Sequence, residues 1–245
     1  MKVVFLGATK GMGRALARLL AQRGDQLFLL GRDVDDLRRS ATDLELFGAA
    51  GSVGVAPCDL MDPSTFVPAL DAASAALGGF DTVVVTAGLF ATQDALEADA
   101  ALTARMLAAD FTNTILFCEE ARKRLLAAGG GTLCVFSSVA GERGRKPVIL
   151  YGAAKAGLSH YLEGLDHKFS AQGLRTITVK PGFVKTGMTA GLTPPPFAAE
   201  ADDAARAALK AMERGRPEVY APGIWRWIML VIRNLPRAVM RRISF

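Results

Sequence analysis

Short apolar runs alternate with longer amphipathic stretches along almost the whole chain, and this alternation limits the folds open to it. The apolar runs have the length and residue types of buried strands, and the stretches between them have helical spacing. Strands that alternate with helices indicate a parallel, doubly wound α/β sheet with right-handed crossovers. We expect strands at Lys2–Leu6, Gln26–Leu30, Gly51–Ala56, Thr82–Thr86, Thr132–Ser137 and Thr176–Lys180, with Val219–Ala221 as a short seventh, and helices at Arg14–Arg23, Ser64–Leu77, Ala101–Ala127, Tyr151–Ala171 and Ala199–Arg214.

Charge divides the chain into a neutral body and a basic end. From Pro222 to Phe245 there are five arginines and no acid, so 24 of the 29 basic residues remain to balance 24 acids elsewhere. A neutral body argues against nucleic acid as a partner. We therefore expect one domain over residues 1–221 and a basic, tryptophan-bearing helical tail over 222–245. Three scattered cysteines and two histidines indicate reduced thiols, no metal site and a cytoplasmic location.

A glycine-rich segment follows the first expected strand and precedes the first helix. Its first glycine permits a tight turn, its second lets the backbone approach a pyrophosphate, and its third lets the helix pack on the strand. The helix then points free N–H groups at the phosphates. This order predicts a Rossmann-type dinucleotide site, although a simple tight turn would need the same glycines. The residues expected at the phosphates are Gly7, Thr9, Lys10, Gly11, Met12 and Gly13.

The residue after the second strand indicates which dinucleotide is preferred. An NAD enzyme usually places an acid there against the ribose hydroxyls. Here Gly31 is followed by Arg32, and the first acid is Asp33. Lys10 and Arg32 are two cations that suit a 2′-phosphate. We therefore favour NADP(H) as the cofactor, with NAD(H) as the alternative, in which case both cations are ordinary surface charges.

A tyrosine and a lysine at the start of a helix supply the chemistry. Tyr151 and Lys155 are four residues apart and therefore share one helix face. A lysine cation beside a phenol lowers the pKa of the phenol and eases proton transfer. Ser138 lies 13 residues before Tyr151, at the end of a strand, where its hydroxyl would hydrogen-bond a substrate oxygen that gains charge.

Together these motifs resemble the short-chain dehydrogenase/reductase family over nearly the whole chain. The resemblance implies a Rossmann fold and hydride transfer between a nicotinamide cofactor and a ketone or secondary alcohol. It implies that Tyr151 is the general acid, that Lys155 orients the nicotinamide ribose, and that Ser138 polarises the carbonyl. Ser137 is a neighbouring alternative to Ser138. The resemblance also implies cofactor contacts at Asp59, Leu60, Ala87, Gly88, Pro181, Gly182, Val184 and Thr186, besides Tyr151 and Lys155. A helix N-cap is the alternative role for Thr186.

Two positions depart from the pattern of the family. Thr86 replaces the asparagine that usually precedes Ala-Gly. Asp110 aligns with the fourth catalytic residue of the family, an asparagine that holds a water next to the lysine. Asp110 is able to accept the same hydrogen bonds but adds a charge near Lys155. Asn113, one turn later, is the alternative residue for that role.

The tail supports two interpretations. Arg226, Arg233, Arg237 and Arg241 fall on one stripe of a helical wheel, whereas Trp225, Ile228, Ile232 and Val239 lie away from it, and Pro236 predicts a kink. Such a helix is typical of membrane-surface binding, which would place the protein on the inner face of the membrane. Its apolar face would otherwise be buried as a lid or a subunit contact.

The substrate is the least constrained prediction. Gly182–Leu192, Pro196-Phe197-Ala198, Val219-Tyr220-Ala221-Pro222 and Leu235-Pro236-Arg237 look like the reductases of decaprenylphosphoryl 2-keto-ribose, which implies a lipid-linked keto-sugar. Fatty or polyketide β-keto groups and steroid-like ketones are the alternatives. Two rival hypotheses are a dinucleotide-binding regulator with impaired turnover and a membrane-attached scaffold. The family resemblance implies a homodimer or homotetramer that meets through the helices around 101–127 and 151–171.

Overall fold

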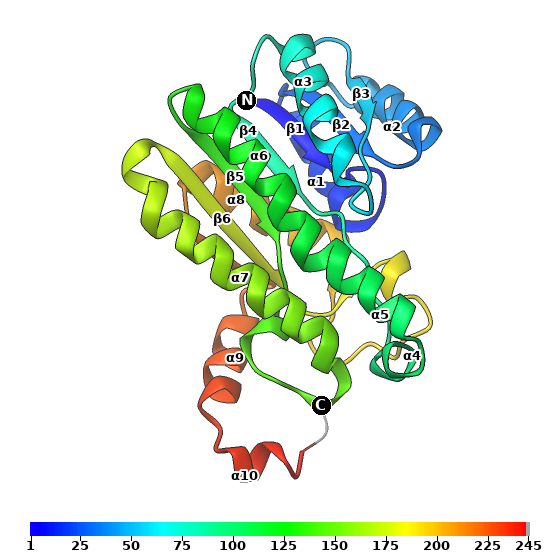
Figure 1. Cartoon of the computed structure of the whole chain (residues 1–245), viewed down its shortest axis with the longest axis vertical. Coiled ribbons are helices and arrows are strands. Elements are labelled where there is room, and N and C mark those ends of the chain that lie inside the picture. The colour runs from blue at the N-terminus through cyan, green and yellow to red at the C-terminus, as the bar shows by residue number, and fades with distance from the viewer. Residues whose placement is uncertain (244–245) are drawn as a thin grey trace.

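A computed structural model describes residues 1–243 of the chain. Seven parallel strands form one twisted sheet in the order β3-β2-β1-β4-β5-β6-β9, which confirms the predicted doubly wound α/β fold (Figure 1). The order reverses between β1 and β4, and in such sheets ligands bind beyond the carboxyl ends of the strands at this point. The strands are β1 (Lys2–Leu6), β2 (Gln26–Gly31), β3 (Gly54–Pro57), β4 (Thr82–Val85), β5 (Gly131–Phe136), β6 (Leu174–Pro181) and β9 (Glu218–Ala221), and β7 (Val184–Lys185) pairs separately with β8 (Ala199–Glu200).

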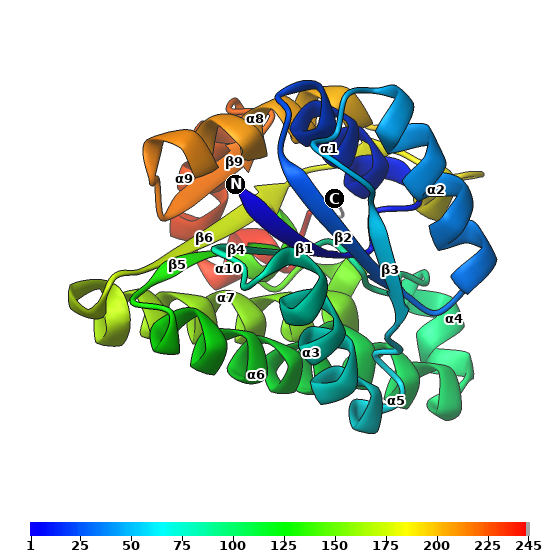
Figure 2. The same cartoon turned by 90° about the horizontal axis from the view of Figure 1, so that it is seen from above.

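Helices cover both faces of the sheet (Figure 2). Helices α1, α2 and α8 pack on one face, and α3, α6 and α7 pack on the other, so each face has its own apolar core. Burial on both faces explains why the strand sequences are almost continuously apolar. The helices are α1 (Gly11–Gln22), α2 (Val34–Leu46), α3 (Phe66–Leu77), α4 (Gln93–Ala98), α5 (Ala100–Leu107), α6 (Asn113–Ala127), α7 (Ile149–Phe169), α8 (Ala201–Arg214), α9 (Trp225–Asn234) and α10 (Arg237–Met240).

The predicted boundaries differ from the structure at several elements. The expected helix Ala101–Ala127 is divided into α5 and α6 by a π-helical segment, Ala108–Thr112. The expected strand Thr132–Ser137 ends at Phe136, so Ser137 and Ser138 lie in the loop that follows. Ala199 and Glu200 belong to β8 and not to the helix after it. Local hydrogen bonding, which apolar patterning does not encode, sets these ends.

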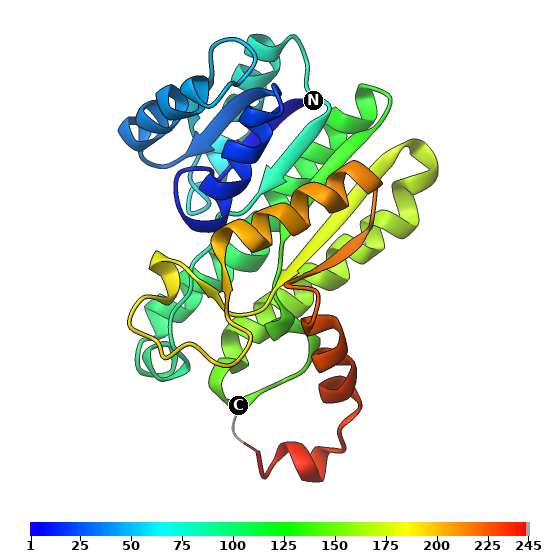
Figure 3. The same ribbon diagram turned by 180° about the vertical axis from the view of Figure 1, so that it is seen from behind.

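The tail forms two short helices at one end of the molecule (Figure 3). Pro236 lies between α9 and α10, at the position where the sequence predicts a kink. Trp225, Met229 and Ile232 are buried against Val139 and Tyr220 of the main body. Residues 244 and 245 of the predicted tail lie outside the described residues. No helix in the described part of the chain is long and apolar enough to cross a membrane.

Trp225 packs directly against Gly182 in the turn after β6. A β-carbon at Gly182 would overlap the indole nitrogen of Trp225. We therefore expect Gly182→Ala to destabilise the protein by about 1–3 kcal/mol through overpacking, which lowers the melting temperature by roughly 2–4 °C per kcal/mol. Calorimetry measures this change in melting temperature. Gly187→Ala is the control, because no atom lies within 4 Å of a β-carbon there; equal melting temperatures for the two variants would contradict the prediction.

Candidate active site

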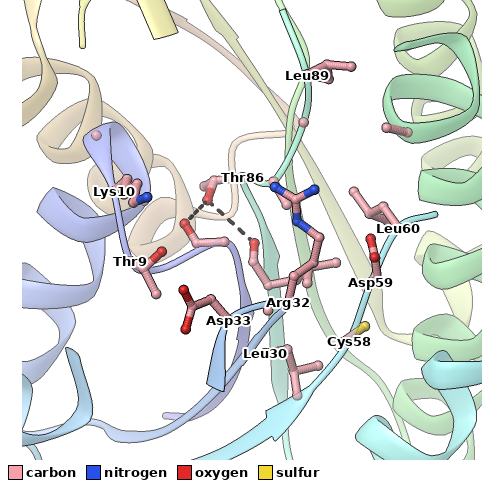
Figure 4. A pocket seen from close by; sticks show the side chains of 18 of the residues that line it. Thr9, Lys10, Leu30, Arg32, Asp33, Cys58, Asp59, Leu60, Thr86 and Leu89 are labelled. Carbon is pink, nitrogen blue, oxygen red and sulfur yellow. Dashed lines mark hydrogen bonds between the residues drawn. The ribbon is translucent and has the colours of Figure 1, made fainter. Parts of the chain in front are cut away.

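A cavity of about 350 Å³ opens beyond the carboxyl ends of β1, β2 and β4, at the point where the strand order reverses (Figure 4). The structure brings together there most of the residues predicted to hold a dinucleotide. The predicted residues that line the cavity are Gly7, Thr9, Lys10, Gly11, Met12, Gly13, Arg32, Asp59, Leu60, Ala87, Gly88 and Thr186. Five predicted cofactor residues, Tyr151, Lys155, Pro181, Gly182 and Val184, do not line it. The sequence missed Arg105, which also lines it, because no motif marks this position.

The glycine segment forms a cradle that fits a pyrophosphate. A β-carbon at Gly13 would overlap the carbonyl oxygen of Gly7, so α1 approaches β1 closely only because residue 13 is glycine. Lys10, the N-cap of α1, makes no side-chain capping bond. The first N–H groups of α1 therefore have no side-chain partner, as expected of a phosphate site at a helix N-terminus.

Some of the charged side chains around the cavity form contacts with other residues of the chain. The Lys10 Nζ atom lies 3.5 Å from a carboxylate oxygen of Asp36. Asp33 caps α2, and its Oδ1 atom accepts hydrogen bonds from the backbone N–H groups of Asp35 and Asp36. Arg32 is exposed, extends into the cavity, and forms no ion pair with any described residue. Arg32 is therefore the cation best placed to meet an anionic group of a cofactor.

Thr86, which stands where the family usually has an asparagine, has a structural role. Its hydroxyl donates a hydrogen bond of 2.9 Å to the carbonyl oxygen of Gly7 (Figure 4). This bond fixes the end of β4 against the glycine segment. Asp59 also shapes the cavity, because its Oδ1 atom accepts a hydrogen bond of 2.9 Å from the Met61 N–H and so holds the turn after β3.

The two neighbouring serines after β5 have different surroundings. The Ser137 hydroxyl donates to the carbonyl oxygen of Lys155 at 3.0 Å and lies 2.7 Å from the Ser159 hydroxyl. These partners tie Ser137 to α7. The Ser138 hydroxyl accepts from the Ala140 N–H at 3.0 Å and donates to the Pro181 carbonyl oxygen at 3.4 Å, and it acts to lower the pKa of Tyr151. The geometry therefore favours Ser138 over Ser137 as the residue that would face a substrate oxygen.

Tyr151 and Lys155 lie one turn apart near the start of α7. The Lys155 Nζ atom is 5.6 Å from the centre of the Tyr151 ring, and the Phe90 ring packs edge-on against that ring at 5.1 Å. Lys155 is buried, with Nζ 3.4 Å from the carbonyl oxygen of Phe136. Ser138, Tyr151 and Lys155, which are separated in sequence, are thus gathered into one cluster.

The π-helical segment brings Asp110 into this cluster. One carboxylate oxygen of Asp110 lies 3.4 Å from the Lys155 Nζ atom, and the other accepts a hydrogen bond of 2.6 Å from the Leu89 N–H. Gly88 leaves room for this contact, because a β-carbon there would lie 2.9 Å from the Asp110 Oδ1 atom. Asp110 therefore forms a buried ion pair with Lys155. Such π-helical turns occur frequently at functional sites.

Burial dominates the electrostatics of the cluster. Burial raises the pKa of Tyr151, while the Lys155 charge lowers it, the Asp110 charge raises it and the hydrogen bond with Ser138 lowers it. Lys155 therefore acts in the predicted direction, but burial and the Asp110 charge outweigh it, and the net pKa of Tyr151 lies above the ordinary value of 10. Burial also raises the pKa of Asp110, against the opposing effect of Lys155.

The alternative roles predicted for Asn113 and Thr186 have different outcomes. The Asn113 side chain donates a hydrogen bond of 2.6 Å to the carbonyl oxygen of Leu60, so it holds the loop after β3 and does not substitute for the family asparagine. Thr186 caps the short helix Gly187–Thr189 in a reciprocal capping arrangement, and it also lines the cavity beside Gly11. Both roles considered for Thr186 are therefore compatible with its position.

Comparison with known proteins identifies the class. The family model described as short chain dehydrogenase matches residues 1–196. An uncharacterized oxidoreductase of Mycobacterium tuberculosis is 34% identical over 240 residues, which cover 98% of this chain and 96% of that protein. The cis-4-hydroxycyclohexanecarboxylate dehydrogenase of Sinomonas cyclohexanicum is 32% identical, over 90% of this chain and 86% of that protein.

A solved structure gives the same result for the fold. The chain superimposes on a short-chain type dehydrogenase/reductase from Mycobacterium ulcerans with a TM-score of 0.80 and 23% identity, over 89% of this chain and 86% of that one. The chain belongs to the short-chain dehydrogenase/reductase family, as its motifs predict. It is an oxidoreductase of that family, which generally binds NAD(H) or NADP(H).

Proposed function

We propose that the protein is an NADP(H)-dependent reductase that interconverts a ketone and a secondary alcohol. The observation that carries this proposal is the cluster of Ser138, Tyr151 and Lys155 near the dinucleotide cavity. A phenol, a hydroxyl and an ammonium group are the groups needed to protonate and polarise a carbonyl. The name of the Sinomonas relative, a dehydrogenase of a cyclic secondary alcohol, supports the same substrate class.

Each residue of the cluster has a separate task in reduction. The bound cofactor supplies the hydride. Ser138 donates a hydrogen bond to the carbonyl oxygen as negative charge develops there, and Tyr151 transfers its phenolic proton to that oxygen. Lys155 provides a positive charge beside the phenol, and the family resemblance implies that it would also hold the nicotinamide ribose. Because its pKa is raised, Tyr151 carries its proton at neutral pH and is ready to act as the acid.

The proposal is tested by turnover. The purified protein is incubated with NADPH and a panel of ketones that contains cyclic ketones, a polyprenyl-linked keto-sugar, β-keto acyl thioesters and steroid-like ketones. We expect oxidation of NADPH with formation of the corresponding alcohol for at least one ketone class. Tight binding of NADPH without turnover of any member would favour a regulatory protein in place of the enzyme.

Cofactor preference is tested at Arg32. Arg32→Ala should raise the dissociation constant of NADPH by about tenfold or more, because a charge-assisted hydrogen bond is worth roughly 1.5–3 kcal/mol. The dissociation constant of NADH should change little, since NADH has no 2′-phosphate. Arg38→Ala, an exposed arginine of α2 that pairs with Asp35, is the control. Equal weakening of both cofactors by Arg32→Ala would contradict the preference for NADP(H).

We also propose that the protein assembles as a homodimer or homotetramer through α6 and α7. The exposed Leu116 on α6 supports a contact on this face. Light scattering after size-exclusion chromatography measures the assembly, and a monomer at micromolar concentration would reject it.

A further inference from the structure

Helix α9 has two apolar faces, of which the main body covers only one. Trp225, Met229 and Ile232 form the covered face and are 8%, 0% and 8% exposed. They pack on Val139 and Tyr220. An ordinary surface helix would present polar residues on its opposite face.

The opposite face of α9 is apolar and exposed. Ile224, Trp227, Leu230 and Val231 are 43%, 64%, 43% and 63% exposed, and spacings of three and four residues place them on one stripe. No described residue covers them. We call these four residues the outer stripe. Contiguous apolar surface of this kind normally marks a site of interaction.

The tail that carries the outer stripe also carries exposed arginines, on α9, on α10 and directly after α10. Arg226, Arg237, Arg241 and Arg242 are exposed. Arg233 is also exposed, but it pairs with Glu142 at 3.1 Å. The segment from residue 222 to the end contains no acid. The surface therefore combines exposed apolar side chains with unopposed positive charge.

The main body holds the tail in place. The Arg143 guanidinium donates a hydrogen bond of 3.0 Å to the carbonyl oxygen of Leu235, and the Lys146 ammonium donates one of 2.9 Å to the carbonyl oxygen of Arg241. Figures 1 and 3 show α9 and α10 projecting beyond the rest of the fold, where they are accessible to a flat surface.

We propose that α9 and α10 dock the protein on an anionic phospholipid membrane. The outer stripe enters the boundary between headgroups and acyl chains, where tryptophan is favoured. The arginines contact lipid phosphates and the acidic headgroups. A second copy is a poor occupant, because a two-fold contact would place the arginines of both copies together. With ten residues in α9, the helix lies in the plane of the membrane and does not span it.

Cosedimentation of the full chain with vesicles tests the proposal. We expect binding to vesicles that contain phosphatidylglycerol, little binding to phosphatidylcholine alone, and weaker binding as salt is raised. The triple variant Arg237→Gln, Arg241→Gln, Arg242→Gln should bind about a hundredfold more weakly, since each basic residue near an anionic surface contributes about 1 kcal/mol. The double variant Trp227→Ser, Val231→Ser should also lose binding.

Matched variants on the far side of the molecule are the controls. Leu46→Ser removes an apolar side chain that is 84% exposed, and Arg38→Gln removes an exposed cation. Both should bind like the original chain. Absence of binding to anionic vesicles, or equal binding by all variants, would overturn the proposal. Loss of a dimer in the Trp227→Ser, Val231→Ser variant, without vesicle binding by the original chain, would assign the stripe to a second copy. Cofactor binding by each variant confirms that it is folded.

Discussion

Replacing Tyr151 by phenylalanine should lower ketone reduction by roughly 10²- to 10⁴-fold, which is the usual contribution of a positioned proton donor. The phenylalanine ring fills the same space against Phe90, so the cluster keeps its packing while the proton is lost. We expect the loss in kcat, with a much smaller change in the affinity for NADPH. Stopped-flow measurement of NADPH oxidation under single-turnover conditions checks the hydride step directly.

Tyr161→Phe is the matched control for this experiment. Tyr161 lies on the same helix, but its hydroxyl donates to Glu119 at 2.7 Å and points away from the cluster. Its loss should affect stability and leave turnover unchanged. Turnover by Tyr151→Phe at the original rate would show that another group supplies the proton, and the proposed mechanism would fail.

Replacing Asp110 by alanine should have the largest effect on stability. The change leaves Lys155 buried without its counter-charge and removes the acceptor of the Leu89 N–H bond. Breaking one side of a buried ion pair costs about 3 kcal/mol or more, which corresponds to a melting temperature roughly 6–12 °C lower. Asp110→Asn keeps an acceptor for Leu89 and should cost less. Thermal unfolding of the two variants in parallel measures the difference.

Asp110→Asn should also shift the pH profile of ketone reduction to lower pH. Reduction needs the protonated phenol, so its rate falls as pH rises through the pKa of Tyr151. The Asp110 charge raises that pKa, and its removal leaves the Lys155 charge, which lowers it, less opposed. The alkaline limb of the profile should therefore move toward neutral pH in the variant.

Asp25→Asn separates this electrostatic effect from a general loss of stability. Asp25 is also a buried, ion-paired aspartate, with contacts of 2.6 Å to the N-terminal amine and to Arg23. It is remote from the cluster in the fold and should cost stability without moving the profile. A profile that is unchanged in Asp110→Asn, or equally shifted in Asp25→Asn, would show that Asp110 does not tune Tyr151.

Much of the fold and of the cavity was predictable because the responsible signals are local in sequence. A strand buried on both faces is apolar throughout, and a pyrophosphate cradle needs glycines at fixed positions after the first strand. The family model and the strand order confirm the class that these signals predicted. The separation of Tyr151 and Lys155 by one helical turn likewise follows from sequence spacing alone.

The features of the site that the sequence did not predict depend on contacts between segments that are distant in sequence. A π-helical turn, which no residue pattern marked, sets the approach of Asp110 to Lys155. The net pKa of Tyr151 depends on burial by surrounding elements, which a pair of residues in sequence does not reveal. Arg105, on α5, lines the cavity although it lies far in sequence from the glycine segment. The roles of these residues appear once the elements are assembled.

The packing of Trp225 on Gly182 bears on the predicted division of the chain into a domain and a tail at residue 221. The composition changes sharply there, from a neutral body to a basic end, yet the indole is seated in the turn that follows the sixth strand. The family resemblance predicts a cofactor contact at this turn, although Gly182 itself does not line the cavity. The last helices are therefore packed into the main body, and a chain cut after Ala221 would expose the surfaces of Gly182, Val139 and Tyr220 that Trp225 covers.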